Sequence, residues 1–185
     1  IDRAIKKGAG ELGGVTFEVL LYEGYGPGGI GLIVEVTTDN KNRSASEVRS
    51  IFSKGGGNLA GAGALAFNFK RRGQFLIAKD KMDEDSITEL ALDNDAEDII
   101  SESDHYEIVC ETAQYDALAE ALNMAGVEAD SSELAYLPKN VVQISSAESA
   151  KKVLKLVESL EDLEDVKAVH GNYDMDESLL ETISG

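Results

Sequence analysis

The chain has 185 residues, of which 43% are hydrophobic and 28% charged, so it can bury the core of one large domain or two small ones. No apolar run reaches the roughly 18 residues of a membrane-spanning helix, and a single cysteine cannot form an internal disulfide. A membrane-spanning protein and a disulfide scaffold are therefore excluded, and we expect a soluble protein of a reducing compartment.

The net charge of −18 argues against indiscriminate binding to nucleic acids, whose backbones are polyanions. The charge is distributed unevenly: residues 1–79 hold 11 Lys and Arg against 7 Asp and Glu, whereas residues 80–185 hold 6 against 28. Of the 18 glycines, 15 also precede position 80. We therefore expect the basic first part and the acidic second part to meet different partners.

The first residues, IDRAIKKG, have the pattern of the last turns of a helix, and the chain starts with Ile1 rather than Met. No signal-peptide pattern is present. We therefore expect residues 1–14 to be the end of an N-terminal helical domain and its linker, with the rest of that domain missing.

Two strands joined as a hairpin are predicted next. Residues 15–23 are rich in β-branched and aromatic side chains, and residues 30–36 form a short continuous apolar run. The glycine-rich stretch 24–29 between them predicts a turn.

A helix and a third strand follow the hairpin. Ser44 begins a capping-box pattern and apolar residues recur at helical spacing, so residues 43–54 are predicted to form a helix. Residues 64–70 alternate like a strand, with Phe67 and Phe69 expected on one face.

The next part of the chain has the element order β-α-β-β-α-β of a ferredoxin-like unit. Its predicted elements are strand 74–78, helix 86–92, strands 97–101 and 106–112, helix 115–125 and strand 128–137.

A further helix, capped at Ser145, and a strand over 166–173 complete the pattern but lack a sheet of their own. The simplest way to bury them is against the first hairpin. We therefore predict an α+β fold made of two α/β domains of ferredoxin-like β-α-β-β-α-β character, one inserted in the other. The predicted boundaries are 15–72 plus 141–175 for the discontinuous domain, 73–140 for the inserted domain, and 176–185 for a C-terminal tail.

A nucleotide-binding site is not indicated. Residues 24–29 formally match GxGxxG, but a strand follows instead of a helix, so a hairpin turn is the preferred interpretation. Neither 55–57 nor 61–63 is followed by the Lys and Ser or Thr of a phosphate-binding loop. We expect no cofactor.

Catalytic and metal-binding residues are not indicated either. His105 and His170 each stand alone, and Cys110 lies in an apolar strand, where a buried and inert thiol is expected. The carboxylates cluster at helix starts and in loops, where they interact with helix dipoles or water. We therefore predict that the protein is not an enzyme and binds no metal.

Basic groups beside glycine-rich backbone point instead to nucleic-acid binding. Lys and Arg bind phosphates, and glycine leaves backbone N–H groups open to an anion. Tyr22 and Tyr25 are candidates for stacking on bases. The alternative, that these charges are simply solvated, has equal weight from composition alone. The candidate binding residues, taken as cations unopposed by nearby acids and one tyrosine, are Lys41, Arg43, Arg49, Lys54, Lys70, Arg71, Arg72 and Tyr25.

Several stretches resemble successive signature motifs of the YebC/PmpR family. The resemblance spans nearly the whole chain, with one departure at NLAGAG (58–63), which is richer in glycine and alanine than the loop expected there. The stretches are YEGYGPGG (22–29), TDNKNR (38–43), VRSIFSKGGGNL (48–59), GALAFNF (63–69), AEDI (96–99) and LEDLEDV (160–166).

This resemblance implies a cytoplasmic, DNA-binding transcriptional regulator with a basic helical domain ahead of Ile1 and no established active site. The family includes a mitochondrial translational activator, so the alternative is a translation factor that binds the ribosome or its RNA, in the mitochondrial matrix for an organellar homologue. The expected partners are DNA or RNA, with the ribosome or RNA polymerase as further candidates, no membrane, and a monomer favoured. The acidity of the second part disfavours wrapping on duplex DNA.

Overall fold

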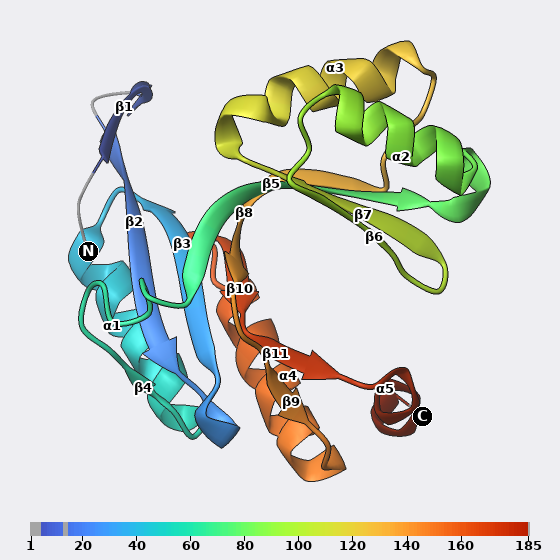
Figure 1. Ribbon diagram of the computed structural model, residues 1–185. Coiled ribbons are helices and arrows are strands. Elements are labelled where there is room, and N and C mark those ends of the chain that lie inside the picture. Colours follow the sequence, from blue (N-terminus) through green and yellow to red (C-terminus); the bar gives the residue numbers. More distant parts are fainter. Residues whose placement is uncertain (1–4, 13–14, 185) are drawn as a thin grey trace. The chain divides into compact units, whose positions relative to one another are not determined.

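The computed structural model describes the backbone of residues 5–12 and 15–184 and the side chains of residues 16–183 (Figure 1). The described chain divides into two compact units. The discontinuous unit contains the described residues up to Phe69 and those from Pro138 onward, and the inserted unit is Lys70–Leu137. The α+β class predicted from the sequence is confirmed.

An antiparallel sheet forms the centre of the discontinuous unit. Its strand order is β1-β2-β3-β10, and the short β4 pairs with the end of β2. The strands are β1 (Ile5–Leu12), β2 (Val15–Tyr25), β3 (Gly31–Thr38), β4 (Asn58–Leu59) and β10 (Val166–Gly171).

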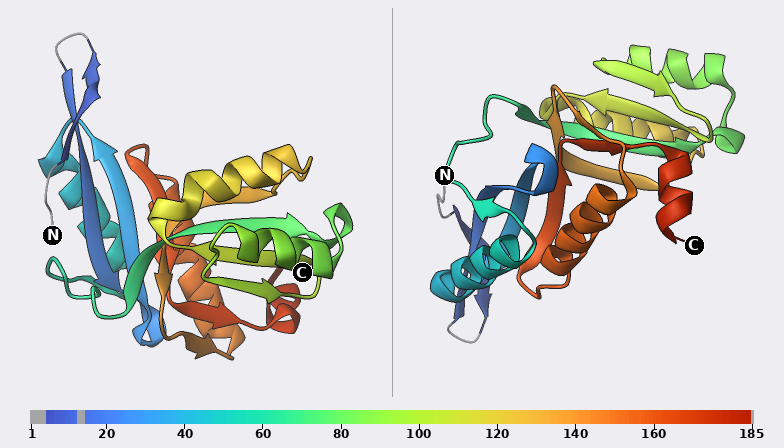
Figure 2. Two further views of the ribbon diagram at one scale, coloured as in Figure 1. Left: turned by 45° about the horizontal axis from the view of Figure 1, so that its top comes forward. Right: turned by 90° about the horizontal axis from the view of Figure 1, so that it is seen from below.

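Two helices, α1 (Lys41–Lys54) and α4 (Ala147–Glu161), contact each other and pack on this sheet; Figure 2 shows them side by side from below. Alternate residues of the strands supply one side of the core, as the two-residue period of a strand requires. Every third or fourth residue of each helix supplies the other side. The buried core residues include Leu20, Tyr22, Leu32, Val34 and Val36 from the strands, and Val48, Phe52, Val153, Leu156 and Leu160 from the helices.

A parallel pair of short strands and a terminal helix complete the discontinuous unit. β9 (Val142–Ile144) pairs with β11 (Tyr173–Met175), and α5 (Glu177–Ser184) follows. Leu179 and Ile183 of α5 pack against the core, so the prediction of a plain C-terminal tail is wrong. The helix forms because these two side chains, four residues apart, share one face that the core can cover.

The inserted unit has a four-stranded sheet in the order β6-β7-β5-β8, with α2 and α3 on the same face (Figure 1). This is the strand order of a ferredoxin-like unit, with the first and third strands at the centre. Phe75, Ile77, Ile108, Leu118 and Leu122 lie in its core, together with the helix residue Ile87. The elements are β5 (Phe69–Ala78), α2 (Glu84–Asp93), β6 (Asp98–Ser101), β7 (His105–Cys110), α3 (Tyr115–Met124) and β8 (Ser131–Pro138).

Short 3-10 turns connect several elements: Pro27–Gly29, Lys79–Lys81 and Thr112–Gln114. The first of them joins β2 to β3, which pair antiparallel along their length. The hairpin interpretation of the GxGxxG match is therefore confirmed.

The helical interpretation of the first residues is wrong for residues 5–8. They belong to β1, which pairs with the edge of β2 from Ile5 opposite Val19. An unpaired strand edge presents a row of free N–H and C=O groups, and pairing with it outweighs a weak local helix preference. The rest of that predicted helix, residues 1–4, lies outside the described residues, as do linker residues 13 and 14.

The strand predicted over residues 64–70 is largely a series of turns, and β5 begins only at Phe69. Phe67 is 72% exposed whereas Phe69 is 6% exposed, so the two rings do not share an environment. The cause is Glu23 on β2: its buried carboxylate accepts hydrogen bonds from the backbone N–H groups of Gly63 and Leu65, both at 2.7 Å. These bonds hold the loop in a turn where alternation alone predicts extended chain.

Both predicted helix caps are displaced. Asn40, not Ser44, caps α1, because its side chain accepts from the N–H of Arg43 at 3.0 Å. Ser146, one residue after the predicted Ser145, caps α4 by accepting from the N–H of Ser149 at 3.1 Å.

Candidate nucleic-acid interface

Arg43 on α1 is bound by carboxylates. Its Nη2 donates to Asp165 Oδ2 at 2.8 Å and to Asp39 Oδ1 at 2.9 Å. The same oxygen of Asp165 accepts from the hydroxyls of Ser44 at 2.7 Å and Thr38 at 2.9 Å. The expectation that Arg43 is unopposed by acids is therefore wrong, because Asp39 stands four residues before it and Asp165, 122 positions later in the chain, folds back beside it.

These hydrogen bonds keep Asp165 ionised. Burial opposes ionisation, but the donors on Arg43, Ser44 and Thr38 outweigh it, so the pKa of Asp165 lies below its usual value of 3.8. The hydrogen bond with Asp165 is also the main reason why the pKa of the Arg43 guanidinium is raised. This cluster joins the TDNKNR and LEDLEDV motifs and is a structural feature of the discontinuous unit.

The remaining cations of α1 lie on two flanks of the helix. Lys41, Arg49 and Lys54 are exposed. Arg49 and Lys54 are five residues apart, which at about 100° per residue separates them by about 140° around the helix axis. Predicted cations on α1 therefore do not share a single face.

Lys70, Arg71 and Arg72 belong to β5 and lie in the inserted unit, whereas the other five predicted residues lie in the discontinuous unit. The Arg72 guanidinium pairs with Glu97 at 2.9 Å, and the Arg71 guanidinium lies 5.6 Å from the centre of the Tyr136 ring. The predicted set is thus shared between two units, and two of its arginines already have partners within their own unit.

The two tyrosines differ in accessibility. Tyr22 is 9% exposed and lies in the core, so it does not offer a surface for base stacking. Tyr25, at the end of β2, is half-buried.

The glycines that follow α1 do not offer free donors to an anion. The N–H groups of Gly55, Gly56 and Gly57 donate to the carbonyls of Ile51, Ser53 and Phe52 at 2.9, 3.3 and 2.8 Å. A Cβ on Gly57 would lie 2.0 Å from the carbonyl oxygen of Tyr25. The three glycines therefore end the helix and allow close packing, and the expectation of open backbone N–H groups is wrong for them.

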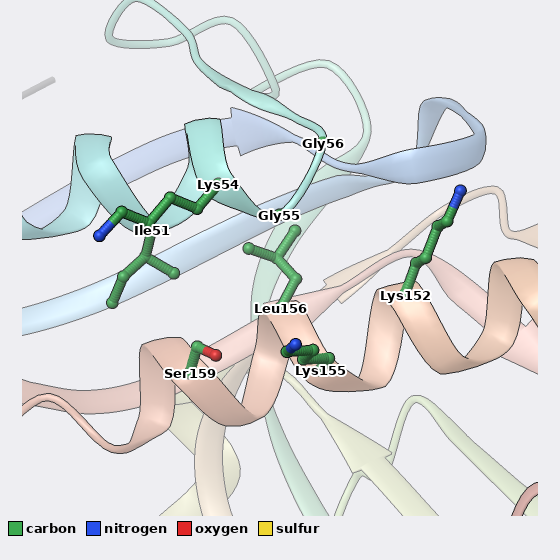
Figure 3. A pocket seen from close by; sticks show the side chains of 8 residues that line it. All are labelled: Ile51, Lys54, Gly55, Gly56, Lys152, Lys155, Leu156 and Ser159. Carbon is green, nitrogen blue, oxygen red and sulfur yellow. The ribbon is translucent and has the colours of Figure 1, made fainter.

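A groove of about 490 Å³ lies between the C-terminal end of α1 and the middle of α4 (Figure 3). Its floor is apolar, because Leu156 points from α4 toward Gly55. Lys54 and Lys152 stand at its opposite ends, and no carboxylate is among the lining residues. These are Ile51, Lys54, Gly55, Gly56, Lys152, Lys155, Leu156 and Ser159.

Local charge in the sequence indicates Lys54 but not Lys152 or Lys155. Both belong to the acidic second part of the chain, although the fold returns α4 to the side of α1. The available signal was the spacing of Lys152, Lys155 and Ser159, which places the three on one flank of the helix beside Leu156.

His105, His170 and Cys110 have ordinary structural surroundings. His105 Nδ1 lies 2.6 Å from Asp104, and His170 Nε2 lies 2.5 Å from Glu35 in the neighbouring strand. Cys110 is buried, and burial raises the pKa of its thiol. Within residues 16–183, no three His, Cys, Asp or Glu side chains gather in a way that could hold a metal ion. No helix in the described part of the chain is long and apolar enough to span a membrane.

Comparisons with known proteins agree with the sequence motifs that resemble the YebC/PmpR family. The family model described as "TACO1/YebC second and third domain" matches residues 17–173. A "probable transcriptional regulatory protein" of Opitutus terrae is 47% identical over 180 residues, which is 97% of this chain and 73% of that protein. A protein of the same description from Sulfurihydrogenibium is 46% identical over 186 residues, covering 100% of this chain and 74% of that protein.

A solved structure shares the fold. The crystal structure of a conserved hypothetical protein from Aquifex aeolicus matches with a TM-score of 0.82 and 38% sequence identity. The match covers 92% of this chain and 70% of that one.

Proposed function

Because this chain belongs to the TACO1/YebC family, whose curated bacterial relatives carry the name "probable transcriptional regulatory protein", we propose that it is a non-enzymatic regulator of gene expression that acts by binding nucleic acid. The observation that carries the proposal is the charge of α1. This helix has four Lys and Arg against a single Glu in a protein with a net charge of −18, and three of these cations, Lys41, Arg49 and Lys54, are exposed and lie outside the carboxylate cluster of Arg43. Such a local excess of cations attracts phosphates and steers their approach.

DNA is the target that the names of the relatives favour. A second target, the ribosome or its RNA, is favoured by the charge of the inserted unit. Residues 70–137 hold 5 Lys and Arg against 18 Asp and Glu, a net charge of −13, which repels an extended duplex. Basic ribosomal proteins neutralise part of the phosphate charge of the structured RNA that they bind. This RNA therefore repels the acidic unit less than an extended duplex does.

Ultraviolet crosslinking of the tagged chain in cells, followed by sequencing of the recovered nucleic acid, tests this function. We expect recovery of DNA or of ribosomal or transfer RNA above the level of a variant carrying Lys41→Glu and Arg49→Glu. A titration with duplex DNA and structured RNA over a salt series should show affinity that falls as salt rises. Equal recovery by parent and variant, together with affinity insensitive to salt, would contradict nucleic-acid binding through α1.

A further inference from the structure

We propose that the groove between α1 and α4 binds the backbone of a single nucleic-acid strand, with Lys54, Lys152 and Lys155 as its phosphate contacts. This inference rests on the proposed function and locates the nucleic-acid contact in this groove. Lys54 belongs to α1, whereas Lys152 and Lys155 come from a helix about 100 positions later in the chain, so only the folded unit creates the site.

The charge of the groove favours an anionic occupant. Three of its eight lining residues are lysines and none is acidic. Lys152 also pairs with Glu148 at 3.3 Å, but both side chains are more than half exposed. An exposed pair one helical turn apart is weak and exchanges readily for a phosphate contact.

The shape of the groove favours a single strand over a duplex. Proteins that read duplex DNA insert a protruding helix or strand into its grooves. Here the cations surround a recess, which can only receive a chain that enters it. The recess has the size of a small-molecule site, so it accommodates a short segment of one strand.

The floor of the groove favours binding without base selection. Ile51 supplies the accessible apolar surface, because Leu156 is only 1% exposed, and Gly55 and Gly56 keep the opposite wall free of side chains. No aromatic side chain lines the groove, so bases have no ring on which to stack. Sugars can lie against the apolar floor while phosphates reach the lysines. RNA and DNA strands share this chemistry.

The test compares two double variants with equal change in net charge. Lys152→Glu with Lys155→Glu alters the groove, and Lys151→Glu with Lys167→Glu alters exposed lysines of the same unit that do not line it. Each protein is titrated with fluorescent oligo(U) and oligo(dT) of about 12 nucleotides and with a duplex of equal phosphate number. Circular dichroism and unfolding midpoints verify that both variants are folded.

We expect the groove variant to bind both single strands at least about tenfold more weakly, and the control variant to stay within about threefold of the parent. The slope of log affinity against log salt is negative, and its magnitude should decrease by about 1.4 in the groove variant, at about 0.7 for each lost phosphate contact.

Three outcomes would overturn the assignment. Equal weakening by both variants would mean that net charge, not the groove, controls affinity. A parent that binds duplex more tightly than single strands, with the same loss in the groove variant, would contradict the single-strand assignment. Competition by poly-glutamate but not by oligo(U) would identify an acidic peptide as the occupant. A parent that binds none of the nucleic acids would instead refute the proposed function itself.

Discussion

Asp165 and Arg43 are hydrogen-bonded at 2.8 Å, although 122 positions separate them in the chain. The pair connects α1 to the loop between α4 and β10, and the Asp165 backbone carbonyl also accepts from the N–H of Thr37 at 2.9 Å. Helix α1 and strand β3 are therefore both hydrogen-bonded to Asp165, immediately before β10 begins.

Replacing Asp165 by Asn should destabilise the discontinuous unit by about 1–3 kcal/mol, because Arg43, Ser44 and Thr38 lose a charged acceptor. Glu164→Gln in the same loop is the control, since Glu164 is exposed. Urea unfolding at neutral pH measures both changes. Equal stability of the Asp165 and Glu164 variants would show that the cluster contributes little.

The same carboxylate should make stability depend on acidic pH. Its pKa is lowered in the folded state, so its contribution is complete above the unfolded value of 3.8 and is lost as the pH falls through the lower folded value. Unfolding free energies measured from pH 6 down to about pH 2 should therefore decrease less steeply for Asp165→Asn than for the parent below about pH 4. Parallel curves for the two proteins would contradict this assignment.

Close packing requires a glycine at position 57, the third glycine after α1, so Gly57→Ala should destabilise the protein by about 3 kcal/mol or more. A Cβ at this position would lie 2.0 Å from the Tyr25 carbonyl oxygen, and backbone must move to relieve the clash. Gly61→Ala is the matched control, because no atom lies within 4 Å of its added Cβ. Thermal unfolding of both variants gives the comparison, and a Gly57 variant as stable as the Gly61 variant would refute the packing role.

The inserted unit should be removable. Asn68 Oδ1 accepts from the N–H of Asn140 at 2.9 Å, and the Asn68 carbonyl accepts from the N–H of Lys139 at 2.7 Å. The chain therefore leaves and re-enters the discontinuous unit at neighbouring points, which a short Gly-Ser linker in place of residues 70–137 can join. We expect the remainder to unfold cooperatively in urea. A molten or insoluble product would argue against the boundary.

The parts of this structure that follow local rules could be predicted from the sequence. Apolar periodicity located α1, α4 and most strands, and the β-α-β-β-α-β order of the inserted unit is visible without coordinates. Contacts between distant segments could not be predicted in the same way. The Glu23 carboxylate that holds the loop around Leu65, and the Asp165 carboxylate that binds Arg43, are ordinary acidic residues until the fold brings their donors to them.

The candidate site also depends on residues that are distant in the sequence, so it could be predicted only in part. Lys54 was identified from local charge, but Lys152 and Lys155 lie in a segment whose average charge is negative. Charge averaged along a chain describes a surface only when neighbours in sequence are also neighbours in space. In a discontinuous unit that condition fails, and the groove is built by residues from both of its segments.

The pairing of β10 with β3, which encloses the inserted unit, also sets an order for folding during synthesis. The ribosome delivers residues 70–137 as one continuous segment, so the inserted unit can close its core as soon as it emerges. The surrounding unit must wait for α4 and β10, and until then β3 has one unpaired edge and Leu32, Val34 and Val36 lack the cover of α4. The earlier segment of the discontinuous unit is thus protected only after the inserted unit has been made, and a nascent chain halted before residue 147 is exposed to aggregation and to chaperones.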